Sequence, residues 1–560
     1  MKNTLRKLLG MLLAAAMLLG CASTALAWEP ESPHDEDLSD YKMCENFGDI
    51  ALRVAVFDKP SIEDWETNDF ILWLEEVTNI DFVFELIPTE SSAEKLGLML
   101  NSGDYPDMFW NIGMTDAMVS RFGVDEGMFL PLNDLIEEHG NFFKKYVMDA
   151  YPATEGIMTQ LDGNIYSLPD VNECYHCKYS NKFWINQAWL DNLGLEMPTT
   201  LDELYEVLVA FRDQDANGNG DPTDEIPMAG DYVNGWQCRI DRPIINCFTY
   251  YPLDLTKGSD QSAVAFGMYL DDGKIVTPFE KAEFKEGVAY VAKLVKEGLI
   301  YEGSFTQDNT GVTNIAESGR LGAVPSGWLW FASIGGDIYR QYVPVMPLKG
   351  PDGYQNLVSF PYDAVTGNAG VISADTKYPV ECFRVLDLFY SFAATIRSNA
   401  GNYGEQWTYN EGDVGINGEP AWYTYLTVWD DTKPQNYCVL QAVPSTRFSD
   451  YRLGQGMDPN VDRYSGDGLE QLLYEVSQEI APYADDSKVV PPLKFTDAEN
   501  SEMAIIKANL SNTIKEGMFA FFTGSRNMDA DFDAWLADLD AQGLPKLIEM
   551  YQAAYDAQYK

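Results

Sequence analysis

The sequence predicts an α/β protein with two lobes and a ligand cleft between them. Segments with the two-residue period of strands alternate with segments that have the helical period. The first such unit has strand patterns at 51–57 and 80–87 and a helical pattern at 70–77 between them, which makes a β-α-β unit. At roughly 100–200 residues per domain, the 560 residues correspond to two or three lobes. Open sheets of this kind bind ligands beyond the carboxyl ends of their strands.

Later segments continue this alternation. Residues 107–110 form the next predicted strand. Thr200 and Glu203 have the spacing of a capping box, in which each side chain satisfies a free amide at the start of a helix. A further helix is predicted over 284–295, and the chain after about Gly466 is predicted to be mostly helical. We therefore expect two parallel sheets flanked by helices.

The composition is strongly acidic and rich in aromatic residues. The chain has 87 Asp and Glu against 38 Lys and Arg, which gives a formal net charge of −49, and 13% of its residues are aromatic. Such a charge repels phosphate backbones, so nucleic acid is not an expected partner. An uncharged solute or a cation remains compatible. The alternative interpretation is that the acidity only serves solubility.

The N-terminus has the features of a signal peptide. Lys2, Arg6 and Lys7 precede an apolar run over 8–20 that is too short to span a bilayer comfortably. We therefore expect residues 1–20 to be removed. No later segment is long and apolar enough to be a predicted membrane span.

Two cleavage signals follow one another after the apolar run. Leu18-Leu19-Gly20-Cys21 resembles a bacterial lipobox, in which Cys21 becomes the lipidated N-terminus. Ala25-Leu26-Ala27 also fits ordinary signal cleavage, which would release the protein. We favour the lipoprotein, with residues 21–46 as a solvated tether and the protein held at the extracellular face of the cell membrane.

The cysteines allow more than one interpretation. Cys174 and Cys177 have CxxC spacing, and Cys238 and Cys247 could supply a second pair. A zinc site is conceivable, but the second spacing is not that of a usual zinc knuckle. A local disulfide or free thiols are the favoured interpretations.

An oxygen-rich loop predicts a structural calcium site. Oxygen-bearing side chains recur at every second residue along this loop, and a hard cation such as Ca²⁺ prefers six to eight oxygen ligands. The predicted ligands are Asp215, Asn217, Asn219, Asp221 through its carbonyl, Asp224 and Glu225. The loop is not an ordinary EF-hand, because Ile226 occupies the position of its bidentate Glu. A solvated acidic loop is the alternative.

Five stretches together resemble a known family. They are Ser102–Asp107, Gly163–Pro169, Leu190–Glu203, the loop 215–227 and Ile372–Pro379. Their order is similar to that of the family 1 extracellular solute-binding lipoproteins of bacterial carbohydrate ABC importers, in the long, calcium-loop branch that includes alginate-binding proteins. The family's Gly-x-Glu-Gly-x-x-Trp run is shorter here and would correspond to Glu405 and Trp407.

The resemblance implies a type II periplasmic-binding-protein fold with hinged lobes. The N-terminal lobe would comprise 47–165 and 350–421, and the C-terminal lobe 166–349 and 422–560. Ligand binding would close the hinge, and the closed form would dock on the transmembrane subunits of an ABC permease. We expect a monomer that captures an oligosaccharide-type solute and is not an enzyme.

Aromatic side chains are the candidate ligand contacts, because sugars present apolar faces and hydroxyl edges. The candidates are Trp110, Asn111, Trp236, Trp328, Trp330, Glu405 and Trp407. For each tryptophan the alternative is a place in a lobe core.

Two other classes of function remain open at this point. A secreted glycan-active enzyme would need two carboxylates that flank a glycosidic bond, and 87 acidic residues always offer such a pair. The sequence contains no Gly-x-Ser-x-Gly elbow, Walker loop or His-Glu-x-x-His motif. A peptide-binding or adhesive surface module is the second alternative.

Overall fold

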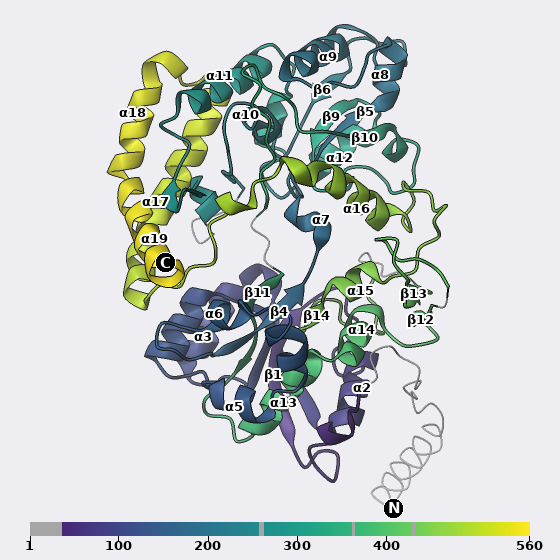
Figure 1. Cartoon of the computed structure of the whole chain (residues 1–560), viewed down its shortest axis with the longest axis vertical. Helices are drawn as coiled ribbons and strands as arrows, with labels where there is room; N and C mark the ends of the chain where they lie inside the picture. The colour runs from purple at the N-terminus through teal and green to yellow at the C-terminus, as the bar shows by residue number, and fades with distance from the viewer. Residues whose placement is uncertain (1–35, 257–262, 361–363, 411, 428–432) are drawn as a thin grey trace, which may run out of the picture.

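A computed structural model describes residues 36–256, 263–360, 364–410, 412–427 and 433–560. It shows two stacked bodies, and the short helix α7 (Tyr175–Lys178) lies between them (Figure 1). The predicted signal peptide, Cys21 and the first part of the predicted tether lie outside the described residues. Within the described residues, no helix is long and apolar enough to cross a membrane.

The first lobe contains a six-stranded sheet with the strand order β14-β4-β11-β3-β1-β2. Its strands are β1 (Ala51–Asp58), β2 (Asp81–Pro88), β3 (Met108–Met114), β4 (Ser167–Asn172), β11 (Val365–Ile372) and β14 (Thr446–Arg447). β1 runs parallel to β2 and β3, as the β-α-β pattern predicts. β11 runs antiparallel to both of its neighbours.

Helices with an apolar stripe pack on this sheet. They are α2 (Asp69–Thr78), α3 (Ser92–Ser102), α5 (Asn133–His139), α6 (Thr154–Met158), α13 (Pro379–Phe389) and α14 (Phe392–Ala400). In α2, Phe70, Ile71 and Leu74 are fully buried, which is the stripe that the helical period predicts. Asn68 caps this helix by accepting from the amide of Phe70.

The second lobe contains a four-stranded sheet with the order β10-β5-β9-β6. Its strands are β5 (Phe183–Asn186), β6 (Ile226–Met228), β9 (Leu321–Pro325) and β10 (Tyr342–Val345). Its helices are α8 (Gln187–Leu193), α9 (Leu201–Asp213), α10 (Asp241–Ile245), α11 (Ala282–Lys296), α12 (Asn309–Glu317) and α16 (Leu469–Ile480). The predicted capping box of α9 is confirmed, since Thr200 and Glu203 each accept from the other's backbone amide.

The C-terminal helices pack beside the second lobe and share its core (Figure 1). They are α17 (Asp497–Phe522), α18 (Met528–Ala541) and α19 (Leu544–Tyr559). Trp535 of α18 is fully buried against Phe279 and Phe521, so this subdomain is continuous with the lobe.

Short elements complete the description. They are α4 (Asp116–Met118), α15 (Ser449–Leu453), the hairpin β7 (Tyr269–Asp271) with β8 (Lys274–Val276), and the hairpin β12 (Trp407–Tyr409) with β13 (Tyr423–Tyr425).

The observed sheets differ from the expected organisation in two respects. Both are mixed rather than parallel, because strands that enter from the other lobe, such as β11, run against their neighbours. In addition, β4 and β14 pair in the first sheet, although the boundaries at 165 and 421 assigned them to the C-terminal lobe. We therefore propose that the chain crosses between lobes after Asn172, between Val345 and Val365, and between α15 and α16.

Candidate functional site

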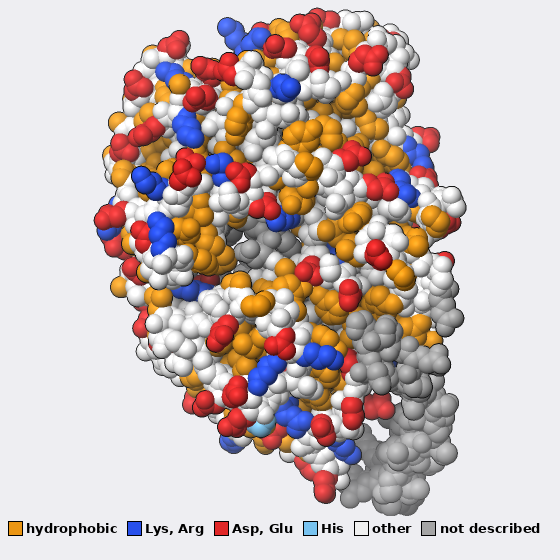
Figure 2. All heavy atoms as spheres, viewed as in Figure 1, with side chains coloured by type: hydrophobic (Ala, Val, Ile, Leu, Met, Phe, Trp, Pro, Cys, Tyr) orange, Lys and Arg blue, Asp and Glu red, His pale blue; other side chains and the backbone are white. Residues whose placement is uncertain are grey.

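A cavity of about 180 Å³ lies between the two lobes. Most of its wall comes from the first lobe, and Glu470 at the start of α16 closes it from the second. Its lining residues are Asn399, Tyr423, Tyr425, Leu440, Gln441, Arg447, Tyr451, Arg452, Gln455 and Glu470. The surface is also hollowed between the bodies in Figure 2, and acidic side chains are scattered over this face of both bodies.

Three tyrosines form a fixed part of the cavity wall. The rings of Tyr423 and Tyr451 are stacked with their centroids 5.5 Å apart. The hydroxyl oxygens of Tyr425 and Tyr451 lie 2.8 Å apart, and the Tyr423 hydroxyl donates to the Tyr451 carbonyl. Burial raises the pKa of all three well above the usual value, so their hydroxyls stay protonated as donors and acceptors at neutral pH.

Each arginine in the cavity wall is paired with a carboxylate. Arg447 Nη2 lies 2.9 Å from Asp170 Oδ2, and Arg452 Nη2 lies 3.3 Å from Glu470 Oε2. Burial by itself would raise the pKa of Glu470, but His176, Arg452 and Tyr175 stabilise the carboxylate and bring its pKa to about 2. The wall therefore offers hydrogen-bond donors with little net charge.

Three of the predicted tryptophans gather in the second lobe. Trp236, Trp328 and Trp330 are each half-buried, and Trp330 Nε1 donates to the Trp236 carbonyl at 3.5 Å. Gly327 lies against the Trp236 ring, where any Cβ would come within 2.3 Å of it. The glycine turn thus lets the backbone approach the indole closely.

His176 connects these tryptophans with the cavity. Its ring meets Trp236 edge-on at 6.5 Å between centroids, and its Nε2 lies 3.5 Å from Glu470 Oε2. Burial lowers the pKa of His176, so the imidazole is neutral at neutral pH.

The other candidate contacts are divided between the cavity rim and the lobe cores. Asn111 lies at the rim, where its Nδ2 donates to the carbonyl of the cavity residue Gln441 at 2.8 Å. Glu405 is exposed. Trp110 is fully buried among Phe82, Phe84 and Phe389, so for this residue the core alternative applies.

Trp407 also requires a correction. Its side chain is 1% exposed, and its Nε1 donates to the Gly401 carbonyl. It belongs to β12, contacts Tyr403 and Tyr409, and shares a buried cluster with Tyr423 and Tyr451. The ring therefore supports the tyrosine wall from behind and has no free surface for a ligand in this conformation.

Sequence reasoning missed the tyrosines and arginines of the cavity. A signal was present for two of them, since Tyr423 and Tyr425 are two residues apart and therefore lie on one face of a strand. The sequence contains no signal that brings Tyr451 and Arg452 to this strand.

The predicted calcium loop follows α9 and is ordered around its oxygen-bearing side chains. Asn217 and Asn219 both donate to the carboxylate of Asp224, and Glu225 accepts from the amide of Ala216. Asp215 Oδ1 and Glu225 Oε2 are buried and have no hydrogen-bond partner. Two buried carboxylate oxygens without a donor fit a hard cation as the missing partner.

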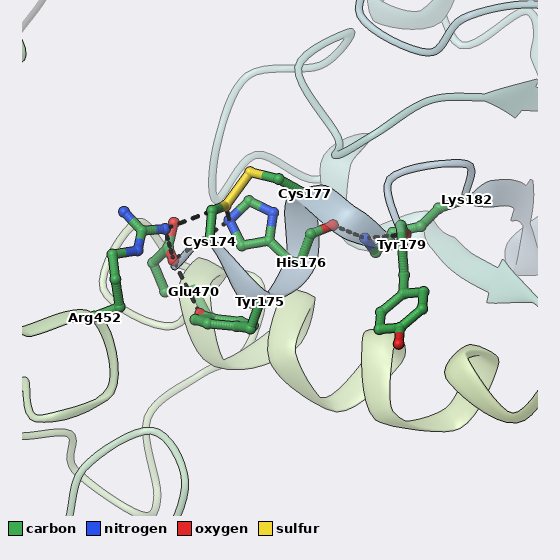
Figure 3. The surroundings of a disulfide bond; sticks show 8 residues. All are labelled: Cys174, Tyr175, His176, Cys177, Tyr179, Lys182, Arg452 and Glu470. Atoms are coloured by element: carbon green, nitrogen blue, oxygen red, sulfur yellow. Dashed lines mark hydrogen bonds and ion pairs between the residues drawn. A yellow bond between two sulfur atoms is a disulfide. The ribbon is translucent and has the colours of Figure 1, made fainter. Parts of the chain in front are cut away.

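Cys174 and Cys177 form a disulfide, as shown in Figure 3. This confirms the local-disulfide interpretation and leaves no thiolate for zinc in this state. Cys238 and Cys247 are free and buried, so they do not form a second pair.

The amino-acid sequence is similar to curated bacterial proteins. The fructooligosaccharide ABC transporter substrate-binding protein FusA of Streptococcus pneumoniae is 26% identical over 480 residues, which cover 83% of this chain and 82% of FusA. The polygalacturonan/rhamnogalacturonan-binding protein YtcQ of Bacillus subtilis is 23% identical over 350 residues, or 61% of this chain and 63% of YtcQ.

Solved structures show the same fold. FusA of S. pneumoniae in complex with kestose superposes with a TM-score of 0.73 at 23% identity, covering 90% of this chain and 99% of FusA. An extracellular solute-binding protein from Bifidobacterium longum subsp. infantis gives 0.76 at 21% identity, covering 92% of this chain and 100% of that one. These likenesses confirm the two-lobed α/β class.

A family comparison covers most of the first lobe and much of the second. Residues 55–396 match the family of bacterial extracellular solute-binding proteins, which is more than half of the chain. The chain therefore belongs to this family.

Proposed function

We propose that this protein captures an uncharged oligosaccharide between its lobes and delivers it to an ABC importer. One observation carries the proposal: the inter-lobe cavity is lined by tyrosines, amides and charge-paired arginines, and His176 links its residue Glu470 to the half-buried Trp236. Aromatic faces suit the apolar faces of a sugar, and the amide, hydroxyl and guanidinium groups suit its hydroxyl edges.

The charges support an uncharged ligand. Arg447 and Arg452 are each neutralised by a carboxylate, so the cavity has no free cation among its lining residues. The whole chain has a formal net charge of −49, which repels a polyanion at longer range. A polyuronate would therefore meet repulsion outside the cavity and no compensating charge within it.

Two further observations support capture rather than cleavage. FusA is a fructooligosaccharide ABC transporter substrate-binding protein, and among the lining residues of the cavity Glu470 alone carries a carboxylate. Glu470 is held by Arg452, whereas a glycosidase needs two carboxyl groups on opposite sides of the bond.

We also propose that lipidated Cys21 tethers the protein to the extracellular face of the membrane, where it would meet the permease as a monomer. Cleavage after Ala27 would instead release it. Mass spectrometry of the mature N-terminus distinguishes a diacylglyceryl cysteine at position 21 from an unmodified chain that begins at Trp28.

We propose a structural Ca²⁺ in the loop 215–225. Removing the ion should lower the melting temperature, because a ligand that binds only the folded state stabilises it by about 2.7 kcal/mol at 100 times its Kd. The Asp215→Asn variant should melt where the chelated wild type melts and be insensitive to added Ca²⁺. Equal melting of calcium-loaded and chelated wild type would contradict the site.

The experiment for the main proposal is a calorimetric and Trp-fluorescence titration with neutral oligosaccharides, kestose among them, and with oligogalacturonides and peptides as comparisons. We expect saturable binding of a neutral oligosaccharide and its recovery intact by mass spectrometry. Recovery of shortened sugar would indicate a glycan-active enzyme, and saturation by peptides alone would indicate a peptide-binding module.

A further inference from the structure

A cluster of potential metal ligands lies where the chain crosses from the first sheet to the second. Cys174, His176 and Cys177 belong to the segment between β4 and β5, and Glu470 lies in the first turn of α16 in the second lobe. The described part of the chain holds one group of three His, Cys, Asp or Glu side chains whose ligand atoms all lie within 4.8 Å of one another, and it consists of these cysteines and His176. Figure 3 shows Glu470 pointing at the same group.

Two distances at His176 are close to the edges of a tetrahedral zinc site. His176 Nε2 lies 3.6 Å from Cys174 Sγ and 3.5 Å from Glu470 Oε2. Zinc–nitrogen and zinc–sulfur bonds of about 2.0 and 2.3 Å at the tetrahedral angle place N and S about 3.5 Å apart. Nε2 of His176 is therefore already spaced from one sulfur and from one carboxylate oxygen as two ligands of one ion would be.

The surroundings also suit a metal. His176 and Cys174 are 7% and 5% exposed, so their ligand atoms are shielded from water. Arg452 Nη2 lies 3.6 Å from Cys174 Sγ and 3.3 Å from Glu470 Oε2. Two thiolates and one carboxylate balance one Zn²⁺ and one guanidinium, so the cluster would be neutral with Arg452 as an outer partner.

We propose that the Cys174–Cys177 disulfide masks a zinc site made of Cys174, His176, Cys177 and Glu470, which binds the ion only after reduction. Reduction breaks the sulfur–sulfur bond and adds two electrons and two protons, which gives two thiols. Two equivalents of a small thiol supply these and end as their own disulfide. Zinc binding then displaces both thiol protons into solution.

The site has a consequence for ligand binding, and this part rests on the proposed function. Glu470 lines the inter-lobe cavity and pairs with Arg452, which lines it as well. An ion that bound Glu470 would link the segment between β4 and β5 to α16. It would also weaken the ion pair between Glu470 and Arg452. Zinc on the reduced protein would thus change sugar affinity, whereas the oxidised protein would be insensitive to zinc.

The test compares oxidised and phosphine-reduced full-length protein, both saturated with Ca²⁺ so that the loop 215–225 is filled. During reduction the phosphine becomes its oxide by taking oxygen from water. Zn²⁺ is titrated by calorimetry, and Co²⁺ is used as a probe because thiolate ligation gives an intense near-ultraviolet charge-transfer band. We expect one Zn²⁺ per reduced chain, bound at least about 100-fold tighter than to the oxidised chain.

Two variants and one control localise the ion. The double variant C174S/C177S should lose the tight site and the Co²⁺ band while it keeps Cys44, Cys238, Cys247, Cys382 and Cys438. Glu470→Gln should weaken Zn²⁺ at least about tenfold, since even loss of an outer-shell partner costs that much. Cys44→Ser, which removes a free thiol elsewhere, should bind as the reduced wild type does.

The outcome that overturns the proposal is equal zinc affinity for the oxidised and the reduced wild type, a comparison that needs no variant to fold. Retention of the Co²⁺ band in C174S/C177S would overturn it too. The sugar titration is recorded separately on the oxidised chain. If the oxidised chain binds no sugar, the proposed function is wrong and the zinc site is unaffected. If the reduced chain binds no metal, the zinc site is wrong and the proposed function is unaffected.

Discussion

The two walls of the candidate site differ in chemistry. The first lobe contributes tyrosine hydroxyls, amides and Arg447, whose charge is matched by Asp170. The second contributes Glu470, and its half-buried Trp236, Trp328 and Trp330 lie outside the lining of the cavity. Large aromatic side chains tend to carry most of the binding energy, while polar groups fix orientation. We therefore propose that the tryptophans of the second lobe supply most of the binding affinity, and that the hydroxyl, amide and guanidinium groups of the first lobe supply selectivity.

The largest expected effect tests the aromatic wall. Trp330→Ala should weaken oligosaccharide binding by about 2–3 kcal/mol, which is a factor of roughly 30–150 in Kd, because a sugar face loses its platform. Calorimetry measures the Kd. The matched control is Trp110→Phe, which should lower stability by about 1–2 kcal/mol and leave the Kd unchanged. If Trp110→Phe weakened binding and Trp330→Ala left the Kd unchanged, the aromatic platform would lie in the first lobe.

The second prediction concerns a buried lysine of the second lobe. Lys182 is 3% exposed, and its Nζ donates only to the carbonyls of His176 and Tyr179. Burial lowers the pKa of Lys182 to about 7. Between pH 7 and about 10 the unfolded chain therefore binds one more proton, so the stability contribution of this group rises with pH.

Comparison with Lys182→Met isolates this contribution. From pH 7 to 9 the unfolding free energy of the wild type should gain about 2 kcal/mol relative to the variant, as measured by denaturant unfolding. Lys274→Met, at an exposed site, should show no such trend. A constant difference across this range would mean that Lys182 remains charged in the folded protein.

The third prediction tests whether charge pairing sets selectivity in the first wall. Asp170→Asn leaves the charge of Arg447 without its partner. The ratio of oligogalacturonide affinity to neutral-sugar affinity should then rise about tenfold, since a hydrogen bond to a charged group is worth roughly 1.5 kcal/mol or more. An unchanged ratio in competition titrations would show that pairing at Arg447 does not exclude anions. Asp104→Asn, at an exposed pair away from the cavity, serves as the control.

The smallest expected effect comes from a single hydroxyl of the tyrosine wall. Tyr425→Phe removes the partner of the Tyr451 hydroxyl and one possible ligand contact. We expect the variant to lose about 1 kcal/mol of sugar-binding free energy, which corresponds to roughly a fivefold weaker Kd. If this variant cost more than Trp330→Ala, the assignment of affinity to the second lobe would be wrong.

The sequence alone determined the local features of this protein. The β1–α2–β2 unit and the capping box at Thr200 were predicted, and the Cys174–Cys177 disulfide was one of the interpretations left open, because each depends on residues close together in the chain. The oxygen-rich loop was recognised for the same reason. In each case backbone geometry and a short spacing decide which side chains meet.

Only the tertiary structure decided which residues form the cavity and where the lobes begin. Tyr425, Arg452 and Glu470 meet across long connections, and no period or spacing relates them. In the sequence, Trp110 follows a predicted strand end and could be either a cleft or a core residue. Packing against Phe389, far along the chain, makes it a core residue. Long-range burial sets these positions, because the apolar area removed from water depends on the whole lobe rather than on neighbouring residues.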